Sequence, residues 1–277
     1  MPQKFILGYN NYMMIMLQNC RQYLNKLTIL GINFPVMDYL SSLDLFKQWI
    51  ASREPHQLCV ANVYTLVTSL NDKELRDINN RSLTLMDGLP LVWYARAVRG
   101  EKIKERVSGP ELMLLCLDQG RMHGWKHFFL GGKEEVLTDL LSAMQSRFPG
   151  VDIVGSHSPP FRPLSVEEDE RLVTLINQHQ PDFLWVGLGA PKQEKWIAVH
   201  FDKIHIPVQI GVGAAFDFHS GHIPRAPLWM QNSGLEWLYR MLKDRRLIKR
   251  YISTNPVFLA LFLRDFVTVN LRKIAGR

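Results

Sequence analysis

Five apolar runs of the sequence end in polar residues or glycines. They are Asn62, Asp87-Gly88, Gly131-Gly132, Gly187-Leu188-Gly189 and Gly211-Val212-Gly213. Glycine lets backbone N–H groups approach a phosphate closely, and the start of a following helix adds a favourable dipole. One such turn is most often ordinary turn chemistry. Five of them in one chain predict a site for a nucleotide or another phosphorylated ligand.

Six apolar runs of strand length must position these residues. They are Leu58–Asn62, Leu83–Gly88, His127–Gly132, Val151–Ser156, Phe183–Gly189 and Val208–Gly213. Most precede stretches with helical periodicity, such as Glu134–Arg147 and Val166–Gln178. Continuous apolar strands that alternate with amphipathic helices predict an α/β fold with a parallel, Rossmann-like sheet and helices on both faces. Ligands of such sheets bind beyond the carboxyl ends of the strands, where the glycines stand.

The familiar phosphate and metal fingerprints are missing from the sequence. Gly187-Leu188-Gly189 continues as Ala190-Pro191, which breaks the dinucleotide pattern GxGxxG, and Gly131-Gly132-Lys133 lacks the remaining residues of a P-loop. There is no HExxH, Cys/His cluster or Asp-x-Asp, and His219 and His222 are too isolated to indicate a metal. We therefore expect no metal and no cofactor, with cationic side chains and backbone dipoles in their place.

The three cysteines, Cys20, Cys59 and Cys116, are far apart and form no CxxC pair. This usage favours reduced thiols in a cytoplasm, and Cys59 and Cys116 lie in apolar runs that predict core positions. The N-terminal apolar patch, residues 12–17, has little basic flank and no clean cleavage site, so no signal peptide is expected. Residues 1–28 form an N-terminal extension whose role stays open.

The positive charge of the chain is concentrated at its C-terminal end. The net charge is +7, and residues 238–277 carry ten Lys or Arg against two Asp, a local balance of +8, which leaves −1 for residues 1–237. A cationic tail indicates an acidic partner, either nucleic acid, anionic lipid headgroups or a phosphorylated substrate. No run reaches the roughly 20 apolar residues of a membrane span. The apolar stretches that follow Pro256, interrupted at Arg264-Asp265, are instead typical of an interfacial helix.

Three blocks of sequence resemble the WecG/TagA/CpsF family of glycosyltransferases. The first comprises residues 59–64 (CVANVY), 85–93 (LMDGLPLVW) and 106–112 (RVSGPEL), the second is residues 185–196 (WVGLGAPKQEKW), and the third is residues 211–251. The resemblance covers about residues 28–256. It implies an inverting, metal-independent transfer from a UDP-sugar to a polyprenyl-diphosphate-linked sugar, by an α/β core over residues 29–233 and a basic, membrane-associating helical appendage over residues 234–277.

The resemblance also implies roles for single residues. Asp87 matches the proposed base, which takes the proton of the acceptor hydroxyl. Asn62 holds the sugar or orients Asp87, and Gln193 lies with Lys192 where the donor is held. Other donor or diphosphate contacts are expected from the strand-end glycines Gly131, Gly132 and Gly189, from Asp217, which is equally well explained as a turn residue, and from the tail arginines Arg240, Arg245, Arg246 and Arg250.

Several alternatives stay open on the sequence alone. The donor sugar is N-acetylmannosamine, glucose or a uronic acid, and a homo-oligomer is neither required nor excluded. A nucleotide-dependent oxidoreductase on a similar sheet is the main rival activity. A nucleic-acid binder and a non-catalytic family member are the rival classes, but the cationic tail carries an apolar stripe and no aromatic stacking motif, which favours a cytoplasmic enzyme held peripherally on the inner face of the membrane.

Overall fold

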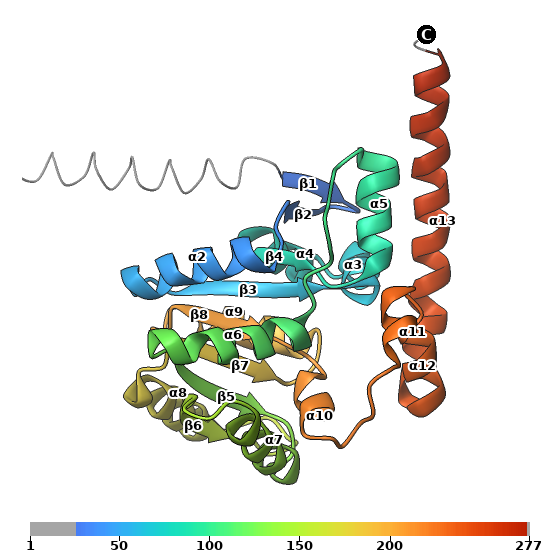
Figure 1. Cartoon of the computed structure of the whole chain (residues 1–277). Coiled ribbons are helices and arrows are strands. Elements are labelled where there is room, and N and C mark those ends of the chain that lie inside the picture. Colours follow the sequence, from blue (N-terminus) through green and yellow to red (C-terminus); the bar gives the residue numbers. More distant parts are fainter. Residues whose placement is uncertain (1–25, 276–277) are drawn as a thin grey trace, which may run out of the picture.

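The computed structural model of the protein describes residues 26–275, and its centre is a six-stranded parallel sheet in the order β4-β3-β8-β7-β5-β6 (Figure 1). The strands are β3 (His56–Ala61), β4 (Leu83–Met86), β5 (Lys126–Gly131), β6 (Asp152–His157), β7 (Phe183–Gly187) and β8 (Val208–Gly211). Each predicted apolar run supplies one strand. The predicted parallel α/β sheet is therefore confirmed.

Helices cover both faces of the sheet, as the sequence predicts. One face packs against α2 (Tyr39–Ser52), α6 (Gly109–His123) and α7 (Glu134–Arg147). The other packs against α3 (Val63–Asn71), α5 (Leu89–Arg99), α8 (Val166–His179) and α9 (Lys192–His200), with α4 (Lys73–Arg81) beside α3 and α9. Phe128 and Phe129 are neighbours on β5 and bury their rings in opposite layers, because successive side chains of a strand point to opposite faces.

The strands end slightly before the ends predicted for them. β7 stops at Gly187 and β8 at Gly211, whereas Gly189 and Gly213 have φ angles of 79° and 60°. These left-handed conformations suit glycine and cannot continue a strand ladder. The last residues of the apolar runs are therefore turns that leave the sheet, which is the geometry that a ligand site needs.

An antiparallel hairpin that the sequence did not predict precedes the sheet. It consists of β1 (Lys26–Ile29) and β2 (Ile32–Pro35), joined through Leu30 and Gly31 in left-handed conformations. The predicted N-terminal extension lies outside the described residues except for its last three, which begin β1, and Cys20 also lies outside them. Cys59 and Cys116 are buried free thiols, as predicted.

The C-terminal region is helical: α10 (Ala215–His219), α11 (Leu228–Asn232), α12 (Glu236–Lys243) and α13 (Arg246–Ala275). The long α13 packs against α3, α5 and α12 (Figure 1). The chain breaks between α12 and α13 at Asp244, whose carboxylate accepts a hydrogen bond from Arg246 N at 3.0 Å. Pro256 is tolerated because it frees only the carbonyl of Ile252, a residue that is 64% exposed.

Among residues 26–275, α13 is the one helix that is long and apolar enough to cross a membrane by length and composition. The expectation that no segment reaches this length was wrong, because Arg264-Asp265 was taken as the end of an apolar run, whereas the helix passes through it without interruption. Only 11% of its most apolar window is buried in the protein. It is a candidate membrane-associating helix, in agreement with the predicted C-terminal appendage.

Candidate functional site

A large cavity opens beyond the carboxyl ends of the strands. Its volume is about 1930 Å³, which exceeds the volume of a typical pocket for one small ligand and leaves room for two substrates. Predicted residues from five strand ends line it, and we call these the strand-end floor: Asn62, Asp87, Gly132, Gly189 and Gly213. The sheet topology thus brings together residues that are up to 151 positions apart in sequence, from Asn62 to Gly213.

The two glycines at the end of β5 have different roles. Gly132 has a φ of 74° and lines the cavity. Gly131, in contrast, is absent from the lining, and a Cβ atom placed on it would lie 2.8 Å from the carbonyl carbon of Gly187. Gly131 therefore allows β5 and β7 to approach one another. Its predicted ligand contact is not seen in the geometry of the cavity.

Asp87 follows β4 directly, and its side chain lines the cavity. Its backbone N–H donates to Ala61 O at 2.9 Å, which extends the β3–β4 pairing by one residue and fixes the position of the side chain. Burial raises the pKa of Asp87 to about 7, against the opposing effect of the nearby Arg106 guanidinium. A carboxyl with a pKa near neutrality can both accept and return a proton at cellular pH.

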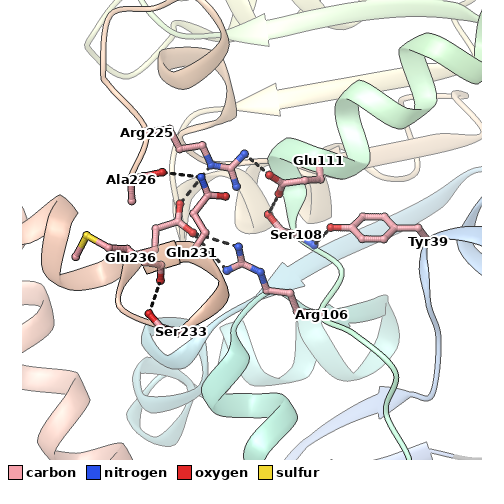
Figure 2. A network of polar contacts seen from close by, with 10 residues as sticks. Tyr39, Arg106, Ser108, Glu111, Arg225, Ala226, Gln231, Ser233 and Glu236 are labelled. Atoms are coloured by element: carbon pink, nitrogen blue, oxygen red, sulfur yellow. Dashed lines mark hydrogen bonds and ion pairs between the residues drawn. The ribbon is translucent and has the colours of Figure 1, made fainter. Parts of the chain in front are cut away.

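A partly buried ionic network adjoins Asp87 (Figure 2). Arg106 contacts Glu236 at 3.3 Å, Glu236 lies 3.5 Å from Arg225, and Arg225 pairs with Glu111. The two arginines are thus already matched by two glutamates. Their field at Asp87 is largely cancelled, since Glu236 and Glu111 raise the pKa that Arg106 lowers. Desolvation therefore decides the protonation state of Asp87.

The network also joins distant parts of the chain. Glu111 accepts a hydrogen bond from the Ser108 hydroxyl at the start of α6, and the Ser108 N–H donates to the Tyr39 hydroxyl at 3.0 Å (Figure 2). Glu236 belongs to α12. The first turn of α12 is therefore tied by charge to the segment that carries Arg106, immediately beside the candidate base.

Asn62 is the N-cap of α3. Its Oδ1 accepts hydrogen bonds from Tyr64 N at 3.1 Å and Thr65 N at 3.3 Å, so this oxygen is occupied within the protein. The side-chain amide nitrogen has no partner among the residues that the structure describes, and Asn62 lines the cavity. Asn62 is thus placed to donate a hydrogen bond to a ligand, and no side-chain hydrogen bond joins it to Asp87.

Gln193 is only 2% exposed and connects two turns of the floor. Its Oε1 accepts from Gly213 N at 3.0 Å, and its Nε2 donates to Glu194 Oε1 at 2.9 Å. These contacts give Gln193 a positioning role under the cavity. Lys192 lines the cavity at the first turn of α9, where a cation is unfavourable unless an anion binds nearby, and it has no ion-pair partner within residues 26–275.

Asp217 lies on α10 and lines the cavity. Burial raises its pKa, opposed mainly by Arg240. Ser220 Oγ and Ile223 N donate to the main-chain carbonyl of Asp217. The carboxylate itself therefore takes no part in this turn, although the sequence alone also allowed Asp217 to be simply a turn residue. His219 and His222 have partners of their own, at Pro110 O and Asp139.

Three of the four predicted tail arginines line the cavity from α12 and α13, and we call them the helical wall: Arg240, Arg246 and Arg250. Arg245 is exposed and absent from the lining, contrary to the prediction. Arg246 is paired with Asp244. Arg250 stacks over the Tyr64 ring with its guanidinium carbon 3.7 Å from the centroid, and its buried Nε has no hydrogen-bond partner among the described residues.

Sequence reasoning missed the ionic network as a functional feature. Arg106, Glu111, Arg225 and Glu236 all lie in the blocks that carry the family resemblance, yet nothing in their spacing shows that they meet. A chemical signal was available, because Arg225 stands in a Pro-Arg-Ala-Pro segment within a cavity-forming block, where an isolated charge needs a partner.

A parallel α/β sheet, glycine turns around a cavity, a carboxyl that titrates near neutrality and a cationic wall together define an enzyme that acts on a phosphorylated substrate. Comparison of the sequence with protein families makes this specific. Residues 27–272 match the Glycosyl transferase WecG/TagA/CpsF family. The chain belongs to this family and is a glycosyltransferase, which sets aside the oxidoreductase alternative.

Curated relatives come from strains of Staphylococcus aureus. In strain MW2, a protein that is 30% identical over 237 residues, covering 84% of this chain and 91% of the relative, is named N-acetylglucosaminyldiphosphoundecaprenol N-acetyl-beta-D-mannosaminyltransferase. Proteins with the same name in strains NCTC 8325 and MRSA252 show the same identity and coverage. These names describe the relatives. They concern one donor sugar and one lipid-linked acceptor.

Proposed function

We propose that this protein is an inverting, metal-independent glycosyltransferase that moves a sugar from a UDP-sugar to a polyprenyl-diphosphate-linked sugar in bacterial surface polysaccharide synthesis. The observation that carries the proposal is Asp87, a carboxyl with a pKa of about 7 that lines the cavity. Glycine turns and unpaired cations line the same cavity. Membership of a glycosyltransferase family supports the reaction class.

The donor is expected over the turns of β5, β7 and β8. Gly132, Gly189 and Gly213 present backbone there without side chains, and Lys192 supplies a cation at the start of α9. Asp217 is placed to accept hydrogen bonds from uridine hydroxyl or amide groups. Arg240 and Arg250 face the same cavity from the opposite side and match the charge of a diphosphate.

The chemical step is a single displacement. Asp87 takes the proton of the acceptor hydroxyl, whose oxygen attacks the anomeric carbon from the face opposite UDP. The bond from this carbon to the UDP oxygen breaks as the new bond forms, and the electron pair leaves with UDP. Arg240, Arg250 and the glycine N–H groups stabilise the charge that develops on the diphosphate. The configuration at the anomeric carbon is inverted.

The relatives' names identify the substrates to test first, N-acetylmannosamine as the donor sugar and N-acetylglucosaminyl-diphosphate on a polyprenyl chain as the acceptor. Glucose and uronic acid donors are the alternatives. Such an acceptor is met at the bilayer, and the weakly buried α13 supports a peripheral position on the cytoplasmic face of the cell membrane. No nucleic acid is expected as a partner, and the proposal does not depend on a homo-oligomer.

The test is transfer by the purified protein in EDTA. UDP-N-acetylmannosamine, UDP-glucose and UDP-glucuronic acid are each offered with N-acetylglucosaminyl-diphosphate acceptors, and UDP release and product are measured, with the anomeric configuration determined by NMR. We expect turnover with one of the three donors and inversion at the anomeric carbon. Adding Mg²⁺ should leave the rate of transfer unchanged. Silence with all three donors, or strong stimulation by Mg²⁺, contradicts the proposal. Among described residues, no group of His, Cys, Asp or Glu is placed to hold a metal ion.

A further inference from the structure

One part of the cavity lining is apolar and is not used by the sugar and diphosphate chemistry; we call it the apolar arm. Its lining residues come from α5, α12 and α13 and are mostly aromatic: Trp93, Trp237, Tyr251, Phe258, Leu259 and Phe262. These side chains are held by one another and by the core. Trp237 contacts Tyr251 with ring centroids 5.9 Å apart, and Phe258 and Phe262 both pack on Tyr94, at 6.3 and 5.8 Å.

Trp93 is fixed in this arm by the backbone before α12. Gly234 has a φ of 72°, and a Cβ atom on it would lie only 2.7 Å from the Trp93 ring. The indole therefore occupies the space that any other residue at position 234 would fill. It nevertheless remains 45% exposed, so that a large apolar surface faces the cavity without a partner from the described chain.

The apolar arm lies on the acceptor side of the candidate base. Asp87 directly follows β4, the edge strand of the sheet, and precedes Gly88, the N-cap of α5, the helix that carries Trp93. The glycine turns of β5, β7 and β8 lie on the other side of β3 in the strand order. A donor over these turns and a ligand along α5 and α13 therefore reach Asp87 from different directions.

The polarity of the arm changes along its length. At its inner end Arg250 and Arg240 provide cations, and Arg250 has a buried, unpaired Nε. Nine residues further along α13, Leu259 lines the cavity while 55% exposed, and Leu263 continues the apolar surface outside it, 50% exposed. This order, charge inside and apolar surface outside, complements an amphiphile whose anionic head enters first.

We propose that this arm binds the first isoprene units of the acceptor's polyprenyl chain, and thereby recognises the lipid as well as the sugar. The inference rests on the proposed function and adds a binding site to it. From Tyr251 to Phe262 the helix rises about 16 Å, which is close to the length of an extended farnesyl chain. The apolar arm ends at the exposed face of α13, and from there the polyprenyl chain continues into the bilayer.

The experiment compares soluble acceptors that differ only in their chain. N-acetylglucosaminyl-diphosphate carrying a methyl or a farnesyl group is assayed without membranes, and the ratio of kcat/KM for farnesyl over methyl reports use of the groove. We expect a ratio of at least about tenfold. Leu259→Gln should lower this ratio about fivefold, whereas the matched variant Leu263→Gln, one turn further and outside the cavity, should keep it.

The methyl acceptor separates the two ways to fail. Transfer to neither acceptor contradicts the proposed function itself. Transfer to both acceptors with a farnesyl-to-methyl ratio of kcat/KM near one overturns the proposed polyprenyl site and leaves the proposed function standing. An equal fall of this ratio in Leu259→Gln and Leu263→Gln does the same. A membrane phospholipid is the competing occupant. If monomeric dihexanoyl phosphatidylcholine abolishes the farnesyl advantage while farnesyl phosphate does not, the arm takes acyl chains and the proposal is wrong.

Discussion

The two sides of the cavity are built by different means. The strand-end floor consists of turns that leave a parallel sheet, and its polar groups are largely backbone groups held by neighbouring strands. The helical wall consists of side chains on α12 and α13, held against the core by α3, α5 and a partly buried ionic network. The floor is thus fixed by the sheet itself, whereas the wall depends on contacts between residues distant in sequence.

This difference matters for catalysis, because the two sides have different chemical tasks. Asp87 on the floor must change its protonation state, and the sheet holds it in a desolvated place where its pKa is about 7. The wall must hold positive charge without changing it, and arginine stays protonated even where burial lowers its pKa, as at Arg250. The strand-end floor therefore carries the group that takes the proton, and the helical wall carries the cations that stabilise the charge on the departing UDP.

The largest effect is expected from the floor. Asp87→Asn removes the proton acceptor with little change of shape, so kcat should fall by about three orders of magnitude. UDP binding, measured as the thermal shift on adding UDP, should be retained, because Asp87 lies on the acceptor side of the cavity. Turnover within tenfold of the unsubstituted protein would exclude Asp87 as the base.

A smaller loss is expected from the wall, and the chain offers a matched pair to measure it. Arg250→Met keeps an unbranched stem over the Tyr64 ring but removes the charge, and kcat should fall about a hundredfold. Arg245→Met removes the same charge from an exposed residue outside the cavity and should cost less than about twofold. Equal losses for both variants would show that the net charge of the tail matters and the position of Arg250 does not.

Membrane binding tests the outer surface of the same wall. Val267 and Ile274 of α13 are 52% and 72% exposed, and changing both to Asn should weaken sedimentation with anionic vesicles about tenfold. The control changes Val166 on α8 and Val199 on α9, which are 71% and 67% exposed, to Asn. If the control pair weakens binding as much, α13 is not the membrane-associating element.

The floor could be predicted from the sequence because its signals are local. An apolar run followed by glycine or by Asn62 or Asp87 marks a strand end, and the parallel topology then brings such ends to one edge. The same reasoning could not separate Gly131 from Gly132, since adjacent glycines carry the same signal. Only the approach of β7 to within 2.8 Å of a Cβ atom on Gly131 distinguishes packing from ligand contact.

The wall was predicted only in outline, because its details are set by long-range contacts. The charge pattern predicted a basic appendage, but the helical phase that turns Arg250 inward and leaves Arg245 outside depends on the break at Asp244. The meeting of Arg106, Arg225 and Glu236 spans 130 positions and leaves no periodic trace in the sequence. The hairpin of β1 and β2 escaped notice because it is only four residues to a strand.

The smallest expected effect concerns stability and returns to Asp87 on the floor. Its pKa is about 7 in the folded protein, above the ordinary value of 3.8 for an aspartate. Well below pH 3.8 the carboxyl is protonated in both the folded and the unfolded state, and it costs no stability. As the pH rises towards 7, the unfolded chain ionises first, so the free energy of unfolding falls and stays lower above pH 7. Asp87→Asn removes this cost.

The expected result is a Tm at least about 3 °C higher than that of the unsubstituted protein at pH 8, with most of this gain lost at pH 4, measured by calorimetry without ligand. Asp44→Asn, at an exposed carboxylate that pairs with Lys47 on the surface, is the control and should show no such gain at pH 8. A gain that is the same at both pH values would mean that shape or packing, and not desolvation of the carboxylate, distinguishes Asp87. The floor would then hold its base without any cost in stability, and the contrast with the wall would lie in geometry alone.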